Sequence, residues 1–232
     1  SHIKEILIQA REFKFSEYVI QIKEYRKFTF FGSSSTVLIN SSAYMPALGI
    51  AFLYSPSVVG IYFLADRIVG LPAQFISSAI NTFFNSSYSK EVRQKKSGSK
   101  SIKQALLYSA SISFFFSLLF LFSHDLILFF LGNDWIDVIS IINFILFVAV
   151  SKILTMPISS LPFIQQKQEY DLYGGLSRVG IIGSALLACF ILNLNELDAL
   201  KIICMSLGLS YLVFLIIYFF LQKNYENNLF KN

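Results

Sequence analysis

The sequence predicts an all-α polytopic membrane protein, built as a bundle of six transmembrane helices. Hydrophobic residues make up 55% of the chain and charged residues only 14%, whereas about a quarter of the residues of a soluble domain are charged. Apolar runs of about 20 residues, the length that crosses a bilayer, recur along the chain. Lysine and arginine gather in alternate connections between these runs, as is typical of membrane proteins.

In the first 30 residues, charged residues alternate with bulky apolar and aromatic residues, as in "FSEYVIQIKEYRKF". Ser16 is well placed to cap a short amphipathic helix, and such a helix would lie on the cytoplasmic membrane face. An extended linker is the alternative. The chain opens with Ser1 and has no continuous apolar core of the kind that a signal peptide needs, so we expect an N-terminally incomplete chain with a cytoplasmic amphipathic linker at residues 1–30.

The six-helix bundle is predicted to occupy residues 31–222, followed by a cytoplasmic tail at 223–232. Polar breaks divide the bundle into six apolar runs, each long enough to span the membrane. The predicted spans are 34–54, 58–86, 105–131, 136–161, 171–193 and 198–221. Both cysteines lie in apolar runs and indicate packed thiols rather than a disulfide.

The basic residues predict the orientation of the spans. The N-terminal segment and the loop "SKEVRQKKSGSKSIK" are rich in lysine and arginine, so these two segments are expected to be cytoplasmic. The alternate connections "YSPS", "LGNDWID" and "NLNELD" contain neither residue and are expected to face outward. Both ends of the chain would then be cytoplasmic.

A polar stripe is the most informative feature of the second predicted span. After Arg67, small or polar residues recur at helical intervals, at Gly70, Gln74, Ser77, Ser78, Asn81 and Asn85. A charge at the bilayer centre costs about 3 kcal/mol on the insertion scale, so we expect Arg67 to line a hydrated cavity. The glycine and serines are more typical of helix packing.

Two further features lie near Arg67. Asp66 precedes it directly, although neighbouring helix positions point about 100° apart, so an ion pair between them depends on side-chain reach. Pro72 removes one backbone hydrogen bond and predicts a kink in the helix. The helix could bend at this point during a conformational cycle.

Other polar residues fall inside the predicted spans, namely Asn40, Lys152 and Arg178. Lys152 either lines the interior or extends toward the cytoplasmic side, and the same alternatives hold for Arg178. Together with Arg67 these residues make the interior cationic. A cationic, hydrated interior suits an anionic cargo such as a diphosphate or an acidic glycan.

No motif of a nucleotide-binding or metal-dependent enzyme occurs. The sequence lacks GxxxxGK[ST], HExxH, CxxC and GxSxG. Asp134 and Asp137 lie one turn apart, but a helix N-terminus that carries its own acidic residues explains them more simply than a metal site. We therefore expect no catalytic residue, no cofactor and no metal site, and a protein that is not an enzyme.

The stretch "FLYSPSVVGIYFLADRIVGLPAQFISSAINTFFNSSYSK" resembles the signature region of the Wzx-type polysaccharide or O-antigen flippases. These belong to the multidrug/oligosaccharidyl-lipid/polysaccharide exporter superfamily and are similar to multidrug (MATE) exporters. The resemblance covers residues 28–90, and is looser to residue 222. Asp66 departs from the family pattern, whereas comparable places are occupied by Gly60, Tyr62, Ala65, Arg67, Pro72, Ala79 and Phe84.

The resemblance implies the C-terminal half of a transporter made of two six-helix bundles. Such a protein moves a polyprenyl-diphosphate-linked oligosaccharide across the bacterial inner membrane by alternating access. Its partners would be this lipid-linked glycan, membrane lipids and the missing N-terminal half, with no nucleic acid. The expected substrate pathway comprises Asn40, Asp66, Arg67, Gln74, Asn81, Asn85, Lys152 and Arg178.

Two alternatives remain open. One is a drug/cation antiporter or lipid II flippase of the same superfamily. The other is a membrane-bound glycan polymerase or acyltransferase, which would need a substantial outward catalytic loop or a buried histidine.

Overall fold

The computed structural model describes residues 15–132 and 135–229, and every regular element in these ranges is helical. The elements are α2 (Phe15–Leu53), α3 (Pro56–Ala65), η1 (Asp66–Gly70), α4 (Leu71–Arg93), α5 (Ser99–Leu121), α6 (His124–Leu131), α7 (Ile136–Thr155), η3 (Met156–Ile158), α8 (Leu161–Ile164), α9 (Glu169–Ile191) and α10 (Glu196–Leu229).

Six helices of the described chain are long and apolar enough to cross a membrane, which confirms the predicted fold class. Their bounds are Phe30–Leu53, Pro56–Arg93, Ser99–Leu121, Ile136–Ile164, Glu169–Ile191 and Glu196–Leu229. The protein is therefore a multi-pass membrane protein.

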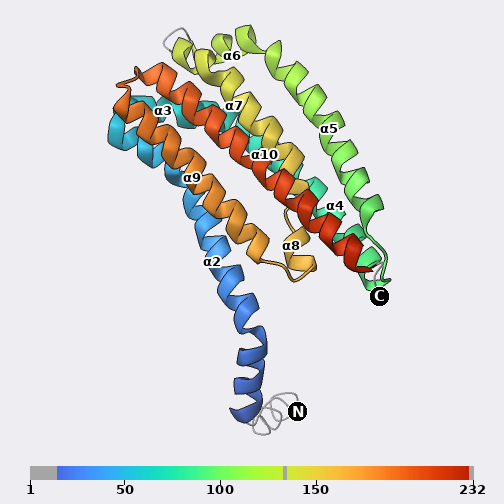
Figure 1. The fold of residues 1–232 in the computed structure, drawn as a ribbon. Coiled ribbons are helices and arrows are strands. Elements are labelled where there is room, and N and C mark those ends of the chain that lie inside the picture. The colour runs from blue at the N-terminus through green and yellow to red at the C-terminus, as the bar shows by residue number, and fades with distance from the viewer. Residues whose placement is uncertain (1–14, 133–134, 230–232) are drawn as a thin grey trace, which may run out of the picture.

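The long helices pack as a bundle around α10, which contacts both α7 and α9 (Figure 1). On one side α2 packs along α9, and on the other α5 packs against α4 and α7. The main core lies between these helices and includes the fully buried Val69, Ile141, Ile182 and Ile203. The start of α2 and the end of α10 lie toward the same end of the bundle, and the α4–α5 hairpin lies beside the end of α10 (Figure 1).

The second span contains a π-helical turn that the sequence did not predict. In η1 the chain makes i→i+5 hydrogen bonds, and the Leu71 N–H closes the segment by donating to the Asp66 carbonyl. Pro72 explains the turn, because it has no N–H to offer the Ile68 carbonyl and its ring crowds the preceding turn. The structure thus has a wide turn on the N-terminal side of Pro72, and a kink of the helix at this point stays a prediction.

The third predicted span ends earlier than expected, and the fourth contains a break in its helix. The predicted span 105–131 divides at Phe122 and Ser123 into α5 and the short α6, and the Ser123 Oγ donates to the Phe120 carbonyl at 3.0 Å. The predicted span 136–161 leaves α-helical geometry after Thr155, because Pro157 and Pro162 cannot continue the backbone ladder. In each case local backbone chemistry interrupts the α-helix within an apolar run that hydrophobicity alone would treat as continuous.

The two ends of the described chain are also more helical than expected. Instead of a separate amphipathic helix before the first span, α2 continues without a break from Phe15 into the membrane-spanning part. At the other end, α10 continues through the predicted tail as far as Leu229. Residues 1–14, in which most of the predicted linker's first half falls, lie outside the described residues, as does Asp134.

Candidate functional site

A lysine–glutamine pair links the second and fourth spans on a partly exposed surface of the bundle. The Lys152 Nζ donates to the Gln74 Oε1 at 3.1 Å. Lys152 comes from the last turn of α7 and Gln74 from the first turn of α4, so the pair joins residues 78 positions apart. A lysine ammonium has three protons, and this hydrogen bond uses one of them.

Asp66 and Arg67 extend the same polar region on η1, which packs against α7. Lys152 and Arg67 are the cations that act electrostatically on the Asp66 carboxylate. The carboxylate lies over Gly70, where a Cβ would overlap its Oδ1, so the glycine makes room for the acid. Asp66 is half-buried and Arg67 is exposed. We call Asp66, Arg67, Gln74 and Lys152 the Lys152 patch.

Arg67 and Gln74 do not follow one uninterrupted helical stripe, because η1 lies between them. The additional residue in a π turn rotates the following positions by about 100° relative to an unbroken α-helix. Gly70 and Ser77 consequently face the bundle interior, where the Ser77 Oγ donates to the Ala73 carbonyl at 2.7 Å. Gln74 and Ser78 are exposed.

Asn81 and Asn85 hold the irregular end of the fourth span. The Asn81 Nδ2 donates to the carbonyls of Met156 at 3.1 Å and Pro157 at 2.8 Å, two acceptors in η3. The Asn85 Nδ2 then donates to the Asn81 Oδ1 at 3.0 Å. The Asn85 Oδ1 is buried without a hydrogen-bond partner among the described residues. This asparagine ladder gives the broken helix its backbone partners.

Arg178 belongs to a different, fully packed cluster between α9 and α10. Only 3% of its surface is exposed. Its Nε donates to the Ser210 Oγ at 3.1 Å, and the guanidinium lies 4.1 Å from the centre of the Tyr211 ring and 5.1 Å from that of Phe214. The side chain therefore remains inside the bundle rather than extending to a membrane surface.

Asp171 is the buried charge in this cluster that the sequence reasoning missed. Its side chain accepts a 2.9 Å hydrogen bond from the Tyr218 hydroxyl of α10, and only 2% of the residue is exposed. Asp171 stands seven residues before Arg178, which places both on one face of α9. That spacing was the available signal, but Asp171 stands at the first position of the predicted span 171–193 and was not among the predicted pathway residues.

The remaining predicted pathway residue, Asn40, lies on α2 and is exposed. The structure brings Asp66, Arg67, Gln74 and Lys152 into one region and ties Asn81 to Asn85. It places Arg178 in a separate interior cluster. Within the described residues, no group of three or more histidine, cysteine, aspartate or glutamate side chains is arranged to hold a metal ion.

Comparison with known proteins identifies the family of this chain. No curated protein and no solved structure matches it significantly. A family model described as "Polysaccharide biosynthesis protein" matches residues 7–140, which is more than half of the 232 residues. The matched region contains Asp66, Arg67 and Gln74, whereas Lys152 lies beyond it. The chain therefore belongs to this family of membrane polysaccharide biosynthesis proteins.

Proposed function

We propose that this chain forms a six-helix half of a Wzx-type flippase, which moves polyprenyl-diphosphate-linked oligosaccharide across the bacterial inner membrane by alternating access. Membership in a polysaccharide biosynthesis family supports the glycan as cargo. The six apolar helices support a transport role. A second six-helix bundle would complete the central cavity, as in transporters built from repeats.

The Lys152 patch is the observation that carries this proposal. Arg67 and Gln74 are exposed on the described chain although they lie in a membrane-spanning segment. Charged side chains in such segments rarely contact lipid and usually face a protein interior or a hydrated cavity. We infer that the patch lines a hydrated cavity, which the second bundle closes from the other side.

The patch has the chemistry to bind a diphosphate. Lys152 keeps two of its ammonium protons for other acceptors while it donates to Gln74. The Arg67 guanidinium supplies planar donors that match phosphate oxygens. Bound between them, the head group would remain in the cavity while the polyprenyl tail stays in the bilayer.

Asp66 is the residue through which the binding of a proton or a cation can be coupled to transport of the cargo. It is the carboxylate on which both patch cations act. A proton or a cation that binds it would change the net charge of the patch and hence its affinity for a diphosphate. The π turn that begins at Asp66 is a place where the helix can bend as the two bundles move.

Complementation tests the proposal. The complete gene, carrying Arg67→Ala or Lys152→Ala, is expressed in a flippase-deficient bacterium at matched membrane levels, and surface glycan is measured. Loss of one charge-assisted hydrogen bond to phosphate should reduce export by about tenfold or more. Arg67→Lys and Lys152→Arg should retain more export because the positive charge remains.

Lys103→Ala is the matched control, because it removes an exposed cation of α5 outside the patch. It should export like the wild type. Normal export by both Arg67→Ala and Lys152→Ala would contradict a role of the patch in binding the cargo.

A further inference from the structure

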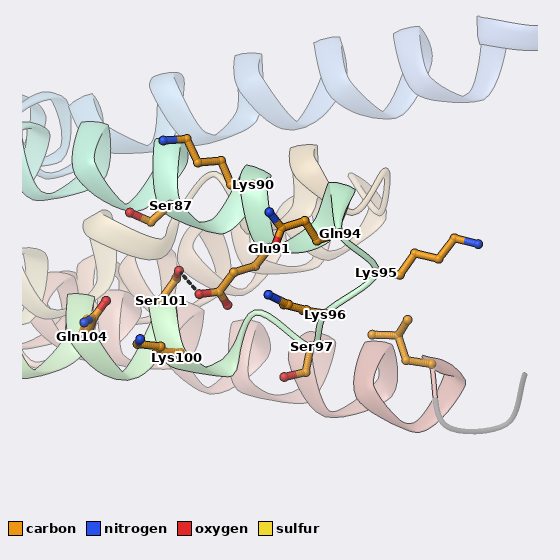
Figure 2. A pocket seen from close by; sticks show the side chains of 11 residues that line it. Ser87, Lys90, Glu91, Gln94, Lys95, Lys96, Ser97, Lys100, Ser101 and Gln104 are labelled. Carbon is orange, nitrogen blue, oxygen red and sulfur yellow. Dashed lines mark hydrogen bonds between the residues drawn. The ribbon is translucent and has the colours of Figure 1, made fainter.

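A basic pocket of about 730 Å³ lies at the hairpin between α4 and α5, close to the end of α10 (Figure 2). Four lysines contribute to its lining, Lys90, Lys95, Lys96 and Lys100. In Figure 2, Lys95 extends away from the tip of the hairpin, while Lys96 and Lys100 lie near Glu91 and Ser101. The pocket has the size of a small-molecule site and carries a strong excess of positive charge.

The lining of the pocket contains one carboxylate, and this carboxylate accepts a hydrogen bond from a serine. Glu91 is its only acidic lining residue, and the Ser101 Oγ donates to the Glu91 Oε1 at 2.9 Å. Among the side chains of residues 30–132 and 135–229, no carboxylate oxygen lies within 4.0 Å of any of the four lysines. No carboxylate of this part of the chain therefore competes with an external anion for their ammonium groups.

The loop between α4 and α5, which borders the pocket, is held in place by contacts with α10 and with Tyr88. The Gln222 Nε2 of α10 donates to the Ser97 carbonyl at 2.6 Å, and the Gln222 Oε1 accepts from the buried Tyr88 hydroxyl at 2.7 Å. Gly98 adopts φ 76° and lies so close to the Tyr88 ring that a Cβ would overlap it. Lys95 and Lys96 thus project from a fixed loop, and Lys90 and Lys100 project from the helices on either side of it.

We propose that this pocket binds a phosphate-bearing anion, with the head group of an anionic phospholipid as its ligand. The pocket lies where two apolar, membrane-length helices end, so its lysines are near the depth at which lipid phosphates lie. Clusters of lysine and arginine at this position attract anionic lipids. The proposal is independent of the Lys152 patch and of glycan transport.

Lipid titration tests the proposal on the purified full chain in detergent. Native mass spectrometry follows the binding of phosphatidylglycerol, with phosphatidylcholine as the uncharged comparison. The double variant Lys96→Gln/Lys100→Gln should weaken phosphatidylglycerol binding by about 30-fold. The control, Arg93→Gln/Lys103→Gln, removes the same charge from exposed positions of the same hairpin outside the pocket and should change binding by less than about fivefold.

Inorganic pyrophosphate shows whether the pocket recognises the phosphate of a lipid head group or phosphate that is free in solution. If it does not compete with phosphatidylglycerol at millimolar concentration, the ligand is the lipid. If it competes in the wild type but does not bind the Lys96→Gln/Lys100→Gln chain, the pocket recognises phosphate without the lipid. Equal losses in the two double variants, or equal binding of phosphatidylcholine and phosphatidylglycerol, would overturn the proposal. Unchanged thermal unfolding of the variants would show that loss of binding is not loss of fold.

Discussion

At the scale of single residues, the buried charges between α9 and α10 show how this protein tolerates ionisable groups in its interior. Arg178 is hydrogen-bonded to Ser210 and covered by two aromatic rings. Asp171 accepts a hydrogen bond from Tyr218. A buried polar group without a partner is costly, so each of these neutral partners contributes to stability.

The Tyr218→Phe variant tests this role. It removes the hydroxyl that donates to Asp171 and leaves the ring in place. The buried carboxylate then lacks this donor, and the free energy of unfolding should fall by about 1–3 kcal/mol. Thermal unfolding in detergent measures the change. Tyr173→Phe, at an exposed position of α9, should leave stability unchanged, and equal stability of the two variants would refute the assignment.

At the scale of elements, close helix packing depends on particular glycines. Gly174 of α9 faces Phe214 of α10, and a Cβ at this position would overlap the phenyl ring. Phe214 is buried and lies between Arg178 and Tyr218, so the ring has little room to move. At Gly180, on the same helix, a Cβ would meet no atom of a neighbouring element within 4 Å.

These two positions form a matched pair of substitutions. Gly174→Ala should destabilise the bundle by about 1–3 kcal/mol because it overpacks the α9–α10 interface. Gly180→Ala should be neutral, or stabilise by about 0.5–1 kcal/mol because alanine favours helix more than glycine does. Thermal unfolding of both variants checks the prediction, and a destabilised Gly180→Ala chain with an unaffected Gly174→Ala chain would reverse the assignment.

The π turn is the second feature at this scale. In Pro72→Ala the residue regains an N–H that can donate to the Ile68 carbonyl, and η1 should convert to ordinary α-helix. Residues before the turn would then rotate by about 100° relative to α4. A cysteine introduced at position 67 should consequently change its rate of maleimide labelling, with little background because Cys189 and Cys204 are buried.

Pro56→Ala provides the control for this experiment. Pro56 stands in the first turn of α3, where a backbone N–H has no helical acceptor. The Arg67→Cys labelling rate should therefore remain that of the parent chain. An unchanged rate in Pro72→Ala as well would show that the proline does not maintain the π turn.

At the scale of the whole molecule, the distribution of basic residues predicts how the bundle is oriented. The α4–α5 hairpin is rich in lysine and should lie in the cytoplasm. The connection between α2 and α3 contains no basic residue and should face outward. Gln94, directly after α4, and Ser57, in the first turn of α3, are exposed positions next to these two connections.

Single cysteines at these positions test the orientation. A membrane-impermeant maleimide added to intact spheroplasts should label Ser57→Cys but not Gln94→Cys. Disruption of the membrane should make Gln94→Cys reactive, because its side of the hairpin then becomes accessible. The opposite labelling pattern would invert the predicted topology.

The apolar helices were determined by the sequence itself, because hydrophobic length and polar breaks are local properties. This reasoning predicted six spans and their approximate bounds. It did not predict η1 or the α5–α6 break, because both depend on how individual backbone hydrogen bonds are satisfied. Arg67 and Lys152 were recognised as unusual for a related reason, since a charge in an apolar run is visible without any structure.

Only the tertiary structure decided which polar side chains meet. Lys152 reaches Gln74 because α7 and α4 pack together, whereas Arg178 is directed to Ser210 and Tyr211 on α10. Helical periodicity assigns a residue to a face of its own helix, but it contains no information about which helix covers that face. The separation of the exposed Lys152 patch from the buried Arg178 cluster therefore arises from interhelical packing.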